Sequence, residues 1–155
     1  MYRPAPNLRF LSVAVLALLP GIVAADYRSD IGHTRLQQEL GITTPDGTGI
    51  RVTQVEGSEK VNGQDAWFPD PANAEFVGKT ISNASGAPAG LYSSHATSVG
   101  GSFYGDLRSI APGVTNIAAF SANDWMGAGA LLTVVGSGGS RPLSSTSRVA
   151  NHSYV

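Results

Sequence analysis

The chain has 155 residues, a length typical of one domain. Its composition, with 42% hydrophobic and only 14% charged residues, is that of a folded globular protein and disfavours a disordered chain. The formal net charge of −1 leaves no basic surplus, so nucleic acid is not expected as a partner. The absence of cysteine excludes a disulfide framework, a thiolate metal site and a cysteine nucleophile.

Residues 1–25 have the pattern of a secretory signal peptide. Arg3 and Arg9 form a basic start, and the apolar run Phe10–Leu19 follows. This run is shorter than the ~20 residues of a membrane span, and small residues allow cleavage after Ala25, with an uncleaved anchor as the alternative. We therefore expect bacterial export to the periplasm, the cell surface or the medium. Cleavage would leave 8 basic and 11 acidic residues, and we expect no membrane contact by this mildly acidic mature chain.

Residues 26–48 are expected to form a short N-terminal segment before the main domain. Asp26 to Asp30 is predicted to be a flexible start. Apolar spacing predicts a helix over His33–Leu40, ending at the glycine that follows it. Thr34 and Gln37 have the spacing of a capping box at its start.

Strands and helices alternate through residues 49–155. Runs rich in β-branched and apolar residues predict buried strands at Ile50–Val55, Val114–Phe120 and Arg148–Val155. A small-residue helix is predicted over His95–Gly101, with two serines before it as N-caps, and an apolar helix over Asp124–Val135. This alternation is typical of an α/β fold with a mostly parallel sheet.

The intervening segments are predicted to be mainly loops. Glu59–Gly90 is assigned as loop with one short strand at Phe76–Ile81, Ser109–Gly113 as a turn and Gly136–Ser147 as a flexible loop. Three strands do not complete a parallel sheet with both faces covered, so we expect residues 49–155 to be the N-terminal portion of a larger domain.

Two residues stand where α/β folds place their chemistry. Glu56 follows a buried strand, and binding sites gather at the carboxyl ends of parallel strands. His95 stands at the start of a helix of small residues, which would leave room beside its imidazole, and a helix N-terminus favours the neutral ring of a general base. Each also has an ordinary reading, Glu56 as a solvated loop residue and His95 as a surface or capping residue.

Other classes of site find less support. His33 and His152 are expected to be surface or packed residues, and with His95 they lie too far apart in sequence to indicate zinc. No glycine-rich loop lies between a strand and a helix, as a dinucleotide site requires, and no G-x-S-x-G indicates an α/β-hydrolase.

Four short segments, in order, resemble the subtilisin-like serine proteases, or subtilases. Gly49–Ser58 (GIRVTQVEGS) resembles the family strand that ends in the triad acid, and Ser94–Gly101 (SHATSVGG) resembles its H-G-T-x-V-A-G motif. Ile110–Val114 (IAPGV) is similar to the turn G-V-A-P-x-A, and Val149–Tyr154 (VANHSY) resembles the strand V-I-N-x-S-[LW]-G beside the substrate cleft.

The resemblance implies a partial subtilisin-like three-layer fold and a serine-type endopeptidase. In that reading His95 would exchange the proton of the nucleophilic serine, and Glu56 would orient His95, as the acid does in the catalytic triad of serine proteases. Ser153, Tyr154 and Val155 would bind an extended peptide or protein substrate by strand addition. No cofactor is required. Structural calcium is common in the family, and Asp65 and Asp70 lie in a loop that would offer oxygen ligands.

The sequence also departs from the subtilase pattern. Glu56 stands where the family has Asp, and Val155 where it has Gly. No G-T-S-x-[AM] motif is present for the nucleophile, and neither Asn123 nor Asn151 matches the oxyanion asparagine by position. We therefore expect this chain alone to be inactive as a fragment of a peptidase. The alternative is a non-catalytic, exported subtilase-like binding module.

Overall fold

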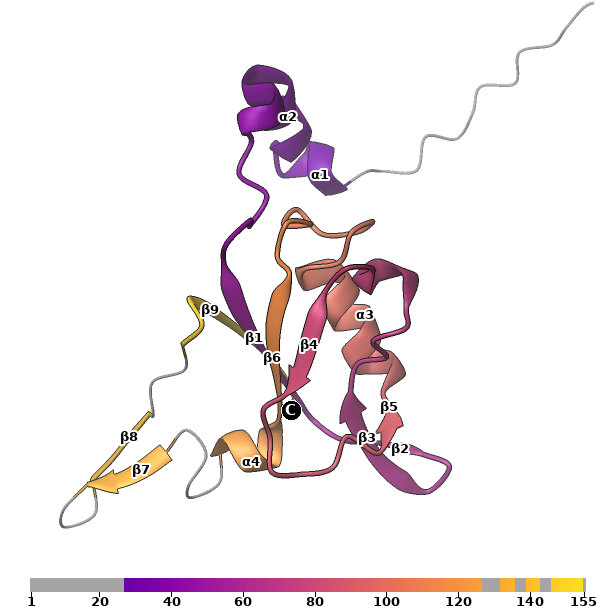
Figure 1. The fold of residues 1–155 in the computed structure, drawn as a ribbon, viewed down its shortest axis with the longest axis vertical. Coiled ribbons are helices and arrows are strands. Elements are labelled where there is room, and N and C mark those ends of the chain that lie inside the picture. The colour runs from indigo at the N-terminus through magenta and orange to yellow at the C-terminus, as the bar shows by residue number, and fades with distance from the viewer. Residues whose placement is uncertain (1–26, 127–131, 136–138, 143–145, 155) are drawn as a thin grey trace, which may run out of the picture.

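The computed structural model describes residues 27–126, 132–135, 139–142 and 146–154, without the side chains of 132–142 (Figure 1). The signal peptide predicted for residues 1–25 lies outside this part of the chain, and so does Val155. No described helix combines the length and apolar character that crossing a bilayer requires.

A parallel sheet of four strands forms the centre of the molecule. Its order is β4 (Thr80–Asn83), β6 (Asn116–Ser121), β1 (Arg51–Glu56) and β9 (Val149–Ser153). All three neighbouring pairs are parallel. The predicted mostly parallel α/β architecture is therefore confirmed, and the three predicted strands correspond to β1, β6 and β9. The burial predicted for the third is wrong, because β9 lies at the edge of the sheet and none of its residues is buried.

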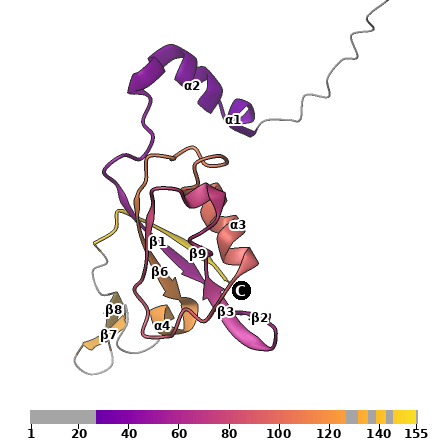
Figure 2. The same ribbon diagram turned by 45° about the vertical axis from the view of Figure 1, so that its right-hand side comes forward.

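Helix α3 (Ser94–Phe103) lies against one face of this sheet (Figures 1 and 2). Ser93 is its N-cap, as predicted, because the Ser93 hydroxyl accepts a hydrogen bond from the amide of Ala96 at 3.0 Å. The helix extends beyond the predicted range His95–Gly101 at both ends. Between helix and sheet lies an apolar cluster of Val52, Phe76, Tyr104, Val114 and Ile117. Burial of these side chains fixes the helix over the strands that end at the candidate site.

The segment predicted to be mainly loop is more ordered than expected. Strands β2 (Glu59–Val61) and β3 (Gln64–Phe68) form an antiparallel hairpin, which β5 (Leu91–Tyr92) extends. Asn62 and Gly63 join the strands with φ angles of 51° and 78°. This Asn-Gly pair is a strong hairpin signal that the loop assignment overlooked.

The strand predicted at residues 76–81 is observed later in the chain. A 3₁₀ turn, η2 (Ala74–Phe76), occupies its start, and β4 runs instead over Thr80–Asn83. Asn73 caps the turn by accepting a hydrogen bond from the amide of Glu75 at 3.0 Å. The turn forms because this cap and the burial of Phe76 outweigh the weak strand propensity of the segment.

The predicted helix over residues 124–135 is wrong. A short helix α4 (Ala122–Met126) is followed by strand β7 (Leu132–Val135), paired antiparallel with β8 (Gly139–Pro142). The flexible loop assigned to residues 136–147 is thus partly strand, and of its remaining residues, 136–138 and 143–145 lie outside the description. Thr133 and the two valines that follow it favour the extended backbone.

The N-terminal segment is helical from Tyr27 onwards, which corrects the flexible start predicted for it. Helix α1 (Tyr27–Asp30) precedes α2 (His33–Leu40), which has the predicted bounds, and the 3₁₀ turn η1 (Gly41–Thr43) follows. The predicted capping box does not form, because Gly32 takes the N-cap position in a left-handed conformation without a side-chain hydrogen bond.

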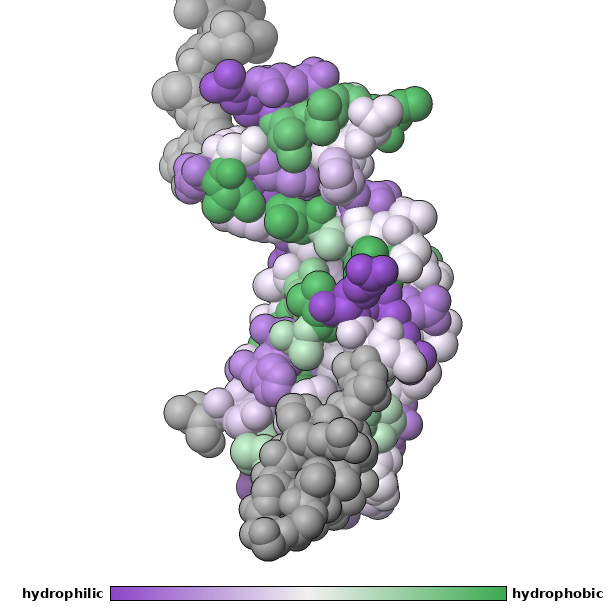
Figure 3. Space-filling view, turned by 90° about the vertical axis from the view of Figure 1, so that its left-hand side faces the viewer, coloured by the Kyte–Doolittle hydropathy of each residue, from purple (hydrophilic) through white to green (hydrophobic). Residues whose placement is uncertain are grey.

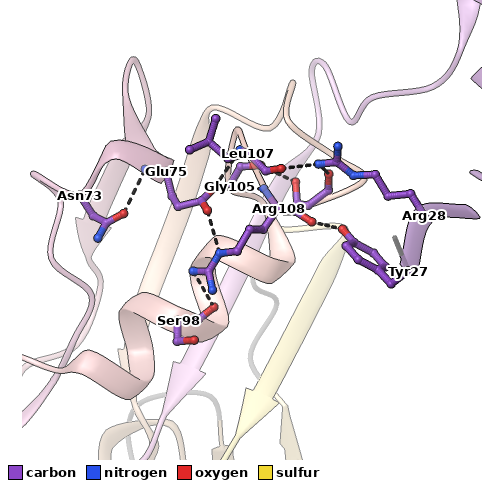
Figure 4. A network of polar contacts seen from close by, with 9 residues as sticks. Tyr27, Arg28, Asn73, Glu75, Ser98, Gly105, Leu107 and Arg108 are labelled. Atoms are coloured by element: carbon purple, nitrogen blue, oxygen red, sulfur yellow. Dashed lines mark hydrogen bonds and ion pairs between the residues drawn. The ribbon is translucent and has the colours of Figure 1, made fainter. Parts of the chain in front are cut away.

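Figure 4 shows how α1 is held to the rest of the molecule. Arg28 donates to the carbonyls of Leu107 and Ser109 at 2.6 and 2.8 Å, and the Tyr27 hydroxyl donates to the carbonyl of Arg108. Behind this turn, Arg108 Nε donates to the buried carboxylate of Glu75 at 2.7 Å. These hydrogen bonds of α1 all meet one turn, at residues 107–109.

Candidate functional site

The carboxyl ends of the parallel strands bring distant residues to one edge of the sheet. Glu56, the last residue of β1, pairs in register with Ser121 of β6 and Ser153 of β9. The N-terminus of α3 lies at this same edge and supplies His95. The structure therefore brings together Glu56, His95, Ser153 and Tyr154, the described residues among the candidates from the sequence.

Glu56 is an almost completely buried acid. Its side chain is 1% exposed, and its position in β1 points it towards α3 because Gln54 and Glu56 share one face of the strand. Burial raises the pKa of Glu56 from 4.5 to about 7, although a hydrogen bond from Gln54 and the nearby His95 work in the opposite direction. The predicted alternative of a solvated loop glutamate is therefore wrong.

His95 is the exposed partner of this acid. Its side chain is 52% exposed, and its Nε2 lies 3.4 Å from Oε2 of Glu56. That oxygen is buried and makes no hydrogen bond within the described part of the chain. In a serine triad the acid binds Nδ1 and leaves Nε2 for the serine, so catalysis would require the ring of His95 to turn.

A second carboxylate holds the start of α3. Oε1 of Glu59, in β2, accepts hydrogen bonds from the Ser93 hydroxyl at 2.6 Å and from the amide of His95 at 3.2 Å. These hydrogen bonds lower the pKa of Glu59, so it remains charged beside the positive end of the helix. The sequence analysis missed Glu59 because it treated the hairpin as loop.

Beneath the pair lies a chain of buried polar groups that the sequence analysis also missed. The Tyr104 hydroxyl donates to Oε1 of Gln54 at 2.5 Å, and Nε2 of Gln54 donates to Oε1 of Glu56 at 2.7 Å. The same nitrogen donates to the carbonyl of Ala96 at 2.8 Å. A glutamine between the apolar residues of a buried strand was the available signal, since a buried amide requires partners.

Two adjoining grooves open beside His95. Ser153 and His95 line both grooves. One continues along α3 and β9, with Ser98, Val99, Ser102, Phe103 and Asn151. The other lies over the hairpin, with Gly57, Ser58, Glu59, His152 and Tyr154. The pair Glu56–His95 thus faces an open surface beside the last residues of β9.

Tyr154 packs closely over Gly57. A Cβ atom at Gly57 would lie 3.1 Å from the Cβ atom of Tyr154, so glycine allows the two segments to approach. His152 is exposed, its ring lies edge-on to Trp125 with centroids 5.1 Å apart, and its Nδ1 lies 3.0 Å from the Tyr154 hydroxyl. Val155, the third predicted substrate-binding residue, lies outside the description.

The residues considered for calcium lie apart from one another. Asp65 pairs with Lys60 at 3.0 Å, and Asp70 accepts a hydrogen bond from the amide of Ala72 at 2.9 Å. Among the described residues, no three His, Cys, Asp or Glu side chains gather in a way that could hold a metal ion. His33 is the first residue of α2, at the helix start that the sequence predicted, and is partly buried.

The geometry provides a base and a buried acid in contact, with access to solvent on one side. Such an arrangement can accept a proton on the imidazole and stabilise the resulting charge with the carboxylate. Comparisons of the chain with protein-family models, with curated proteins and with solved structures gave no match.

Proposed function

We propose that this chain contributes the acid and the base of a serine-type endopeptidase of the subtilisin-like kind. The observation that carries the proposal is the contact of Glu56 with His95 at 3.4 Å, between residues 39 positions apart in sequence, at the carboxyl edge of a parallel sheet. The imidazole ring and the carboxylate meet because the carboxyl end of β1 lies beside the N-terminus of α3 in the fold.

The position of β9 supports the proposal. This strand ends the sheet order among the described strands, and its last residues line the grooves beside His95. An extended peptide could add to such an edge through main-chain hydrogen bonds, which would bring its carbonyl to the imidazole. Ser153 and Tyr154 would then bind the substrate, in a partial three-layer fold of the subtilisin type.

The chemistry would be acyl transfer to a serine hydroxyl followed by hydrolysis. His95 would accept the proton of that hydroxyl and pass it to the leaving amine, while Glu56 stabilises the imidazolium. We propose that residues beyond these 155 supply the nucleophile and the oxyanion-binding amide. The same proposal includes export by a signal peptide, a peptide or protein substrate, and activity without a cofactor.

Labelling of the natural full-length protein with a fluorophosphonate probe tests the activity. We expect the probe to attach to one serine, and His95→Ala to abolish the reaction because the serine then loses its base. His152→Ala is the matched control, since His152 borders one of the two grooves beside His95 but contacts Trp125 and Tyr154. Absence of labelling in the natural protein would overturn the proposal.

Two observations favour a second candidate, a peptide-binding module without catalysis. Nε2 of His95 faces Glu56 instead of a serine, and a glutamate replaces the shorter aspartate of the resemblance. In that case peptides would perturb the backbone amide NMR signals of residues 151–154 while the fluorophosphonate probe fails to react. Reaction with the probe, lost in His95→Ala, would exclude this candidate.

A further inference from the structure

We propose that Gln54 is the residue that positions Glu56 for His95, and that Tyr104 holds Gln54 in the orientation required. This inference rests on the proposed function for its catalytic meaning. The positioning itself is argued from hydrogen bonds alone, because the Gln54 amide donates both to Glu56 and to the helical turn that carries His95.

The orientation of the Gln54 amide is determined by its partners. The carbonyl of Ala96 can only accept a hydrogen bond, so the nitrogen of the amide must face it. The Tyr104 hydroxyl is then free to donate to the amide oxygen. Gln54 is completely buried, and a reversed amide would leave its groups unpaired at a cost of ~1–3 kcal/mol for each.

One nitrogen thereby fixes the acid relative to the histidine. Nε2 of Gln54 lies 2.7 Å from Oε1 of Glu56 and 2.8 Å from the oxygen of Ala96, the residue that follows His95. Anchoring Oε1 directs the second carboxylate oxygen, Oε2, towards His95. A glutamate has one more rotatable bond than an aspartate, so this anchor removes the freedom that the longer side chain adds.

The approach of Tyr104 depends on a missing side chain. Its ring runs back along α3, and a Cβ atom at Gly100 would lie 2.7 Å from its hydroxyl. Gly100 therefore leaves the space through which the hydroxyl reaches Gln54. Burial and the charge of Glu56 raise the pKa of Tyr104, so the phenol keeps the proton that it donates.

The test is the titration of the Glu56 carboxyl group, followed by ¹³C NMR in the full-length protein. Gln54→Leu removes the amide and leaves the titratable residues around Glu56 in place. These residues are His95 and Glu59 on the groove side and Tyr104 below. Because the amide stabilises the carboxylate, we expect the pKa of Glu56 to rise above its value of about 7, by about one pH unit. In Tyr104→Phe, which keeps the ring, we expect a smaller rise.

Thr53→Val is the matched control. Thr53 is equally buried in β1, but it faces the other side of the sheet and donates to the hydroxyl of Ser147 at 2.7 Å. We expect this variant to lose stability without moving the titration of Glu56. Tyr104→Phe keeps the test decisive where Gln54→Leu fails to fold.

The outcomes separate this inference from the proposed function. An unchanged Glu56 titration in folded Gln54→Leu and Tyr104→Phe, or an equal shift in Thr53→Val, would overturn the positioning role. A shift specific to the first two variants supports it even where the fluorophosphonate probe does not react, in which case only the peptidase fails. In a reactive protein, Gln54→Leu should also slow labelling about fivefold at pH 7, because a rise of about one pH unit lowers the charged fraction of Glu56 from about one half to about one tenth.

Discussion

Among the single residues, Glu56 is subject to two opposing effects on its protonation. Burial favours the protonated form, whereas a partner of His95 should be charged. Its pKa is about 7 in the folded protein against 4.5 for an unperturbed carboxyl. The folded state therefore binds this proton more tightly than the unfolded state. The resulting stabilisation is complete below about pH 4.5 and is lost as the pH rises through about 7.

Glu56→Gln should remove this loss, because an amide does not titrate. We expect the unfolding free energy of the variant, relative to the natural protein, to increase by about 3 kcal/mol between pH 4.5 and pH 8. Denaturant titrations over that pH range measure the difference. Glu39→Gln, at an exposed ion pair with Arg35, should show no such trend. Parallel pH profiles for Glu56→Gln and the natural protein would contradict the assignment.

Other carboxyl groups act in the opposite direction at lower pH. Glu75 is desolvated, but hydrogen bonds from the amide of Leu107 and from Arg108 lower its pKa. Its contribution is therefore present at neutral pH and is lost as the pH falls through its lowered pKa. The comparison of Glu56→Gln with the natural protein cancels this effect, because Glu75 is unchanged in both.

At the scale of elements, the close approach of α3 to the sheet requires glycine at position 100. A Cβ atom there would lie 3.0 Å from the ring atoms Cζ of both Phe76 and Tyr104, in addition to the contact with the Tyr104 hydroxyl. These rings belong to the apolar cluster between α3 and the sheet. The helix tolerates a poor helix former because packing decides its stability.

Gly100→Ala should therefore destabilise the protein despite the higher helix propensity of alanine. Overpacking costs roughly 1–3 kcal/mol, whereas the propensity gain is about 1 kcal/mol, so we expect a net loss measured by urea unfolding. Ser102→Ala, at an exposed position of the same helix, should be neutral or slightly stabilising. A stability of Gly100→Ala equal to that of Ser102→Ala would show that the Tyr104 ring can move away at no cost.

At the scale of the whole molecule, the N-terminal helices are distinct from the core. Neither α1 nor α2 contains a buried residue, and apolar side chains lie on the surface of this segment (Figure 3), among them Ile31, Leu36 and Ile42. Polar contacts of Tyr27 and Arg28 with the turn at residues 107–109 hold the segment in place. We therefore expect it to open without unfolding the sheet.

Arg28→Ala should release the segment. Because two hydrogen bonds to carbonyl groups are lost, amides of residues 31–40 should exchange with solvent at least tenfold faster, while amides of β1 and β6 keep their rates. Hydrogen exchange detected by mass spectrometry measures both sets. Arg35→Ala, at an exposed ion pair within α2, is the control. Equal acceleration in β1 would mean that the segment and the sheet unfold together.

Local patterns determined much of the fold. The β-branched residues of Ile50–Val55 predicted a buried strand, which the structure has over Arg51–Glu56. The serine at position 93 predicted the start of α3, and the alternation of elements predicted a mostly parallel sheet, both of which the structure confirms. The same patterns indicated Glu56 and His95 as candidate site residues. The end of a strand and the start of a helix can be recognised from neighbouring residues, and in a parallel sheet these two ends lie at one edge.

Neighbouring residues therefore suffice to predict the type of most elements and the two ends at which Glu56 and His95 stand. Three features became visible in the folded chain alone: the hydrogen bonds of Gln54 and Tyr104 beneath the acid, the hold of Glu59 on the start of α3, and the strand at residues 132–135. The difference lies in the range of the interactions. Strand and helix propensities act over a few neighbouring residues, whereas the partners of a buried amide or carboxylate come from segments up to 50 residues apart in the chain.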